Sequence, residues 1–320
     1  VCSLPLILAL ARSLPLIPTL ALALALIPLP LPLALSQEFT AALEQAKLGL
    51  RLSQASHGEA GLPVAEHLLQ VGEAMSKAAV GTDEQMIAVF EKAKAIWDRE
   101  CGEGHVSTAR CLAGIAGRYI TQGYDGSADD YQKGLEYGQQ GLAVAERAGK
   151  GEGIEAESAL FRIGNAHFYL EQYDEALQHR ERRLRLLLAH FGEEGAKKEA
   201  RVAQAYKDVG DVYDEGLGDF DRALEYYTKA VPVAEEATGK LSHATGLLCQ
   251  NIGVGYFNQQ RYAEAVPWYE RAVAAYTFTH GAENEQYTKT VVRDLQYVKQ
   301  KAAAAERRAA RPVFLGLVCR

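Results

Sequence analysis

The sequence has 320 residues, of which 48% are apolar and 23% charged, so it is long enough to bury one large core or two ordinary ones. Its net charge of −7 argues against a nucleic-acid surface, because phosphate binding needs concentrated Lys and Arg. The five cysteines are scattered and never spaced as CxxC, which predicts neither a disulfide framework nor a zinc site and favours a reducing compartment.

Residues 1–36 form a low-complexity Leu/Ala/Pro segment whose only charged side chain is Arg12. The run 14–35 is long enough for membrane association, but its prolines argue against a regular spanning helix. A signal or transit segment is a second interpretation, since 19–27 lacks proline and small residues precede Gln37. The recurring SLPLI indicates a third, a spurious or disordered stretch. A cytoplasmic protein is expected, with a secreted or organelle-targeted one as the alternative.

From Gln37 onward the chain is rich in strong helix formers and lacks an alternating strand pattern of useful length, so an all-α body is predicted. An incomplete repeat helix is expected at 37–60. The run VGTDEQMI then predicts a helix start, because Thr82 can cap the helix and Gln85 completes a capping box.

About five related units are predicted between residues 61 and 280. The three clearest copies have an aliphatic residue followed by Gly, an aromatic ring three residues later, and Ala twelve or thirteen residues after the Gly. One helix pair cannot bury its apolar face alone, so stacking of neighbours is expected to build a continuous core. The anchor positions of the five copies are residues 72, 116, 164, 210 and 253.

The runs ALFRIGNAHFYLEQYDEALQHRERRL, AYKDVGDVYDEGLGDFDRALEYYTKAV and LLCQNIGVGYFNQQRYAEAVPWYERAV resemble the tetratricopeptide pattern L-G-x₂-Y…A-x₃-F. Their long spacing is similar to that of LGN/Pins-like scaffolds and kinesin light chain-like repeats. The resemblance implies a right-handed α-solenoid of stacked antiparallel helix pairs, a TPR superhelix. A capping helix is expected at 281–311, followed by a tail at 312–320.

Two charged stretches of the sequence are candidate sites. The acid-rich stretch 208–225 fails as an EF-hand, because Tyr213 and Arg222 stand where ligands are needed. It is interpreted either as a solvated helix face or as a patch that attracts a basic partner. In HRERRLR, at 179–185, most arginines are expected on the convex outside, but Arg180 and Arg183 hold usually buried positions and are candidates to pair with a Glu. No catalytic, cofactor-binding or metal site is predicted.

The resemblance also implies a peptide groove on the first helix of each pair, at positions three before and one, four and five after the Gly. This set is apolar at both ends and acidic in the middle, which predicts a protein or peptide partner with a basic segment. Reversing Asp211 and Asp214 to Lys is expected to weaken binding. The groove residues are Phe161, Asn165, Phe168, Tyr169, Lys207, Asp211, Asp214, Glu215, Gln250, Val254, Phe257 and Asn258.

The predicted function is a non-enzymatic protein–protein interaction scaffold or adaptor that uses no cofactor and binds a partner peptide or helix in the concave groove. The alternative is a regulatory or cargo-binding TPR fragment of a larger enzyme or motor-associated protein. The start at Val1, without a Met, and the abrupt end at Arg320 are expected of an incomplete gene product.

Overall fold

The computed structural model describes residues 31–309, which form helices joined by turns without any strand in that range. The interpretations of residues 1–30 and of the tail at 312–320 concern residues outside the described part. The helices are α3 (Leu31–His57), α4 (Leu62–Ala78), α5 (Asp83–Cys101), α6 (Val106–Gly123), α7 (Ala128–Arg147), η1 (Ile154–Ala156), α8 (Glu157–Tyr169), α9 (Tyr173–Ala196), α10 (Ala200–Asp211), η2 (Val212–Gly216), α11 (Phe220–Thr238), α12 (His243–Asn258), α13 (Tyr262–His280) and α14 (Thr288–Ala309).

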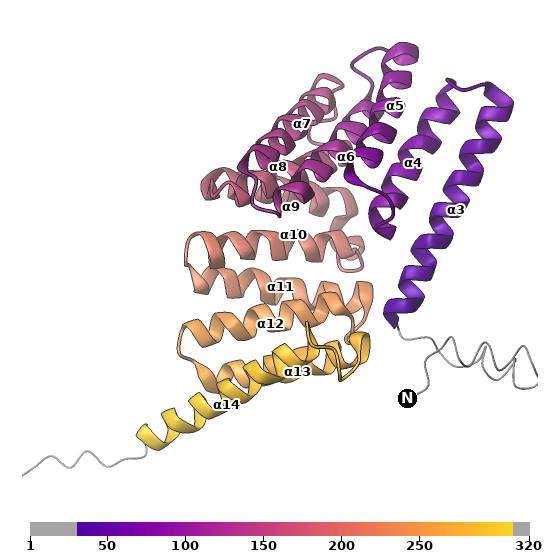
Figure 1. Cartoon of the computed structure of the whole chain (residues 1–320). Coiled ribbons are helices and arrows are strands. Elements are labelled where there is room, and N and C mark those ends of the chain that lie inside the picture. The colour runs from indigo at the N-terminus through magenta and orange to yellow at the C-terminus, as the bar shows by residue number, and fades with distance from the viewer. Residues whose placement is uncertain (1–30, 310–320) are drawn as a thin grey trace, which may run out of the picture.

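The helices stack in chain order into a curved array, from α3 at one end to α14 at the other (Figure 1). Each helix from α3 to α14 packs against the next one along the chain. The predicted all-α solenoid is therefore confirmed. α3 begins at Leu31, inside the Leu/Ala/Pro segment, and α14 packs against α13. No helix among residues 31–309 combines the length and the apolar character that a membrane span requires.

The repeated glycines are places where a side chain of the second helix approaches the backbone of the first, an arginine at Gly164 and aromatic rings at Gly210 and Gly253. A Cβ added at Gly210 would lie 2.5 Å from the ring of Tyr227, and one at Gly253 would lie 2.8 Å from the ring of Tyr269. Both tyrosines come from the second helix of the same pair and are buried. The sequence spacing of Gly and aromatic residue thus reports a close helix–helix contact.

The start of α5 shows how local sequence sets a helix boundary. Thr82 Oγ1 accepts a hydrogen bond from the Gln85 backbone N–H, and the Gln85 side chain accepts one from the Thr82 N–H. This reciprocal arrangement satisfies two donors that the helix itself leaves free. The predicted capping box is confirmed.

A histidine pair joins the last repeat to the capping region. His243 of α12 and His280 of α13 share a hydrogen bond of 2.8 Å between Nδ1 and Nε2, and the ring of Tyr287 stacks on His280 at 4.4 Å. Burial lowers the pKa of His243, and the neighbouring His280 lowers it further; burial also lowers the pKa of His280. Both rings are therefore favoured in the neutral form.

We expect acid to destabilise this junction. Below about pH 6.5 these histidines are protonated in the unfolded chain but resist protonation in the folded protein. The free energy of unfolding therefore decreases as the pH falls below that value. Thermal unfolding followed by circular dichroism from about pH 7.5 to about pH 5.5 should show Tm falling. The fall should be smaller in His243→Asn, which removes one titrating ring. A variant as acid-sensitive as the wild type would contradict this assignment.

Candidate peptide groove

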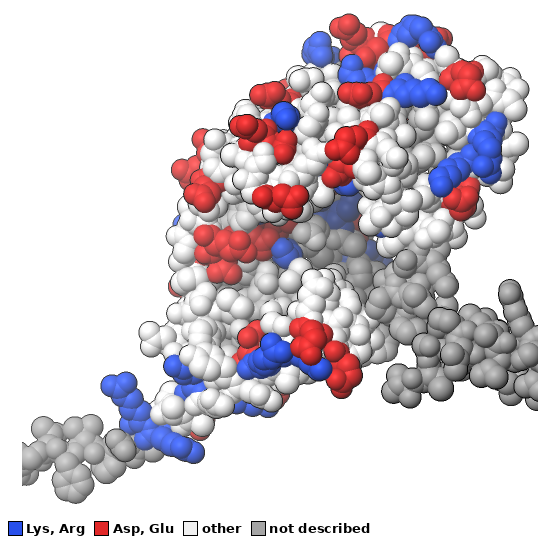
Figure 2. Space-filling model, in the orientation of Figure 1, with Lys and Arg blue, Asp and Glu red and all other residues white. Residues whose placement is uncertain are grey.

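The concave face of the array is hollowed. Figure 2 shows a hollow between the part that contains α4–α9 and the part that contains α10–α14, with Lys and Arg atoms deep inside it and acidic atoms beside it. Two cavities lie along the first helices, one between α10, α11 and α12 and one lined by α4, α5, α6 and α8. Of the twelve predicted groove residues, only Lys207 lines either of them.

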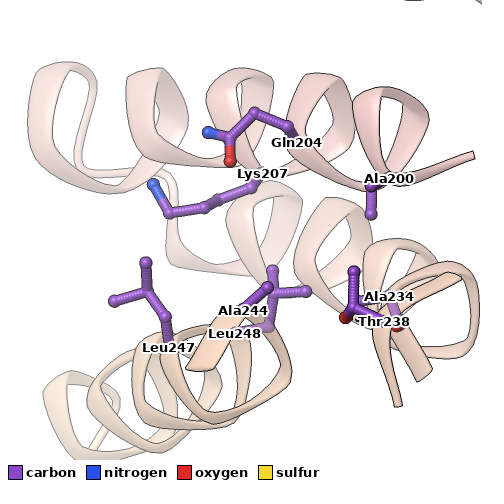
Figure 3. Close-up of a pocket in the computed structure, with 9 residues that line it drawn as sticks. Ala200, Gln204, Lys207, Ala234, Thr238, Ala244, Leu247 and Leu248 are labelled. Carbon is purple, nitrogen blue, oxygen red and sulfur yellow. Dashed lines mark hydrogen bonds between the residues drawn. The ribbon is translucent and has the colours of Figure 1, made fainter. Parts of the chain in front are cut away.

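The cavity between α10 and α12 is small and mainly apolar (Figure 3). Its volume is about 40 Å³, room for a small aliphatic group rather than an aromatic ring. Leu247 and Leu248 of α12 point toward the helix that carries Gln204 and Lys207. The cavity is suited to an apolar anchor beside a charged groove.

In α8, the predicted groove residues pack against arginines of α9. The Arg183 guanidinium lies 4.4 Å from the Phe161 ring centre, and that of Arg180 lies 4.3 Å from the Phe168 ring centre. Asn165 Oδ1 accepts a hydrogen bond of 3.2 Å from Arg180 Nη2. These groove side chains are half-buried and held in place by the repeat itself.

Tyr169, the last predicted groove residue of α8, remains 40% exposed. Its ring stacks on Tyr131 at 5.0 Å, and its hydroxyl donates to the Tyr124 hydroxyl at 3.4 Å. Tyr124, which is also exposed, follows the C-terminus of α6. An aromatic surface therefore lies at this edge of the groove.

In α10, the negative charge of Asp211 is balanced by an ion pair within the protein. It is 9% exposed, and its carboxylate accepts hydrogen bonds from Lys207 Nζ at 2.6 Å, Tyr227 Oη at 3.0 Å and Asn251 Nδ2 at 3.4 Å. These donors come from three helices. Asp211 thus has a structural role. Reversing its charge would disturb the contacts between these helices, so this variant is not a suitable test of partner binding.

Asp214 and Glu215 differ from Asp211, because neither forms an ion pair among residues 31–309. The Tyr227 hydroxyl donates a long hydrogen bond of 3.4 Å to Asp214, and Glu215 is exposed. Partial burial raises the pKa of the Asp214 and Glu215 carboxyls, and Asp211 raises both further, although Lys207 lowers the pKa of Glu215. An unmatched negative charge is therefore present at this point of the groove.

The two acids lie on a π-helical turn, η2, which was not predicted. The Leu217 N–H donates to the Val212 carbonyl at 2.9 Å, a five-residue step. A π turn accommodates one extra residue in a helix. Ala223 follows Gly210 by thirteen residues, whereas the corresponding distance in the flanking copies is twelve. This extra residue was the feature of the sequence from which the π turn could have been predicted.

The last predicted set, in α12, lies partly beneath the capping region. Gln250 Oε1 accepts a hydrogen bond of 2.9 Å from the Tyr276 hydroxyl. Val254 and Phe257 pack on the core cluster to which α14 contributes, and the Phe257 ring lies 5.8 Å from that of Tyr297. Asn258 is exposed. The capping helix therefore occupies surface that was expected to receive a peptide.

The predicted groove positions did not include the position six residues before the repeat Gly, nearer the N-terminus of each first helix. Ser158, Gln204 and Leu247 hold this position in α8, α10 and α12, and each lines one of the two cavities. The same helical stripe, continued by about one further turn toward the N-terminus, was the signal that pointed to them.

The acids of the 208–225 stretch do not share one environment, because Asp208 and Asp211 are buried whereas Glu215, Asp221 and Glu225 are exposed. Asp219 caps α11, Asp221 accepts from Gln259, and Glu225 pairs with Lys229. Among residues 31–309, no group of three or more His, Cys, Asp or Glu side chains is arranged to hold a metal ion.

Of the four arginines of α9, Arg180 and Arg183 are buried, as their positions predicted, whereas Arg182 is only half-buried. Arg183 pairs with Glu157 of α8 and Asp208 of α10, each at 2.8 Å, which confirms a Glu partner for that residue. Arg180 instead donates to the Asp208 carbonyl and Asn165. Arg185 is largely exposed.

Comparison with known proteins agrees with this geometry. Tetratricopeptide-repeat family models match residues 203–235 and 245–284. The fold is similar to that of a putative kinesin light chain of Podosopora anserina with nearly identical TPR-like repeats, at 14% identity, with 67% of this chain and 95% of that chain covered and a TM-score of 0.53.

Two further solved structures are similar. BtubC (BKLC) from P. vanneervenii is 16% identical, with 87% of this chain and 93% of that chain covered and a TM-score of 0.53. A Rap protein complexed with competence and sporulation factor is 16% identical, with 85% and 90% covered and a TM-score of 0.51. At these identities the likeness shows the fold alone. No curated protein sequence matches the chain.

Proposed function

Because the chain is a tetratricopeptide-repeat protein, we propose that it is a non-enzymatic scaffold that binds a partner peptide or helix in its concave groove. The bound segment carries basic residues that face Asp214 and Glu215 and an aliphatic residue that enters the cavity beside Leu247. A repeat fold of this class is a protein-interaction module, and a Rap protein of similar fold has been solved complexed with competence and sporulation factor.

The unmatched acid pair carries this proposal. Asp214 and Glu215 have no cation near enough for an ion pair within the described range, and partial burial raises the pKa of both carboxyls. A Lys or Arg brought by a partner would stabilise their ionised forms and relieve this cost. Lys207, which lines the apolar cavity between α10 and α12, precedes Asp214 by seven residues, or about two helical turns, so the partner has both a charged and an aliphatic contact.

A fluorescence-anisotropy titration tests this proposal. The probe is a pool of acetylated, amidated peptides with a Lys-Lys or Arg-Arg centre and aliphatic flanks. The Asp214→Asn/Glu215→Gln variant should bind the best peptide about tenfold more weakly, and added salt should weaken wild-type binding more than variant binding.

The matched control is Glu193→Gln/Glu194→Gln, which removes two exposed acids outside the groove positions. This variant should bind like the wild type. Equal binding by the groove variant and the wild type would overturn the assignment of Asp214 and Glu215, and no binding by any peptide of the pool would overturn the proposed function.

A further inference from the structure

A second cavity, of about 150 Å³, lies across the first helices of three successive repeats. Glu73 and Lys77 come from α4, Arg110 from α6, and Ser158 and Arg162 from α8. Glu73 and Lys77 also line a neighbouring cavity of about 330 Å³ between α3 and α4. The two cavities thus adjoin at Glu73 and Lys77, so the hollowed surface continues toward α3.

Arg162 has no ion-pair partner among residues 31–309, and its guanidinium lies 5.0 Å from the centre of the Phe161 ring. Its Nε atom is buried without a hydrogen-bond acceptor, and no described carboxylate forms an ion pair with it. The guanidinium lies against the backbone of Gly117, where a Cβ would come within 2.7 Å of Cζ. Burial lowers the pKa of Arg162 to about 10, and Arg118 contributes to the lowering. A positive charge here is costly unless an anion joins it.

The surroundings of Arg162 are positive overall. Arg110 is the only one of the cavity's three cations with an ion pair in the described part of the chain, to Glu73 at 2.9 Å and Glu66 at 3.5 Å. Lys77 is exposed. Glu73 is the one acid among the lining residues, so two positive charges stay unmatched. Figure 2 shows basic atoms deep in the hollow.

We propose that this cavity is an anion subsite that holds the side-chain carboxylate of an acidic residue within the bound peptide. The planar Arg162 guanidinium is suited to two-point contact with a carboxylate, and Lys77 adds a second positive charge. An internal residue is favoured over a chain end, because the hollowed surface continues beyond the cavity toward α3.

This inference rests on the proposed function and extends it. The acids at Asp214 and Glu215 belong to α10 and η2, whereas the anion subsite lies on α4, α6 and α8. A partner that fits both is therefore bipolar, with an acidic residue toward the N-terminal repeats and a basic centre toward α10. Such a charge pattern fixes the direction in which the peptide lies.

The test uses the full chain and the same acetylated, amidated peptides, in which one Glu is moved stepwise to either side of the basic centre. At one spacing, on one side only, the Glu peptide should bind about tenfold more tightly than its Gln counterpart. Arg162→Met should abolish that difference. Asp214→Asn/Glu215→Gln should keep the difference while losing the preference for Lys over Gln at the centre.

Thermal unfolding separates binding from a structural role. Since Arg162 is unpaired, Arg162→Met should leave Tm unchanged or raise it, whereas a structural residue would lower it. Arg185→Met, at an exposed site on α9, is the control for loss of an arginine and should leave the Glu preference intact.

Three results would overturn the inference. If wild-type protein prefers basic peptides but is indifferent to Glu, the subsite is wrong and the proposed function survives. A peptide with a free C-terminal carboxylate is titrated for comparison with the amidated set, and if it alone gains affinity, the subsite holds a chain end rather than a side chain. If no peptide binds, both proposals fall.

Discussion

Arg183→Met should lower the free energy of unfolding by about 3–5 kcal/mol. The side chain is 3% exposed, and it is the cation that both Glu157 and Asp208 contact. Its removal leaves two carboxylates buried without a positive charge. The loss would be measured by urea unfolding followed by circular dichroism, with an unchanged m-value as the check on two-state behaviour.

Two companion variants sharpen that measurement. Arg185→Met, on the same helix but largely exposed, should change stability by no more than about 0.5 kcal/mol. Adding Glu157→Gln and Asp208→Asn to Arg183→Met should recover much of the loss, because the buried charges then disappear together. A single-variant loss below about 1 kcal/mol would contradict the account of this ion triad.

Asp211→Lys should destabilise the protein by about 3–5 kcal/mol. It places a second cation beside Lys207 and removes the acceptor of Tyr227 and Asn251. Asp214→Lys, three residues later at a less buried site, should cost less than about 1 kcal/mol. The same urea titration compares the two variants, and equal losses would show that Asp211 does not hold these helices together.

This comparison also determines which variants can report on binding. A groove mutant that includes Asp211 would lose its partner simply because it unfolds. Substitutions confined to Asp214 and Glu215 keep the Lys207–Asp211 pair and so measure recognition.

The sequence predicts the helix pairs well because the signals that define them are local. Gly210 and Gly253 with their facing tyrosines recur at fixed distances within one unit, so a single chain reveals each contact. Local signals do not predict which charged groove side chains are paired within the protein. Asp211 is neutralised by residues from α10, α11 and α12, and no spacing within one repeat shows that Tyr227 and Asn251 converge on it.

Two properties of the groove, the covering of Phe257 and the unpaired charge of Arg162, could not be predicted, for different reasons. Phe257 has the right spacing, but whether the surface is open depends on where the capping helix packs. Arg162 lies next to a predicted groove residue, and nothing in a local pattern shows that it lacks an acidic neighbour. An unmatched charge is a property of the assembled array, and it becomes visible only when every surrounding helix is in place.

The π turn makes the direction of Asp214 and Glu215 depend on chain length. Deleting one residue between Val212 and Gly216 would restore an ordinary α-helical step there and change the angular positions of Asp214 and Glu215 around the axis, while the residues after the turn keep their register. The acids would then leave the groove without a change in their chemistry. A repeat in which the Ala follows the Gly by twelve residues, like the two flanking copies, would present different side chains at this point. Inserting or deleting a single residue can therefore alter partner choice where a substitution would not.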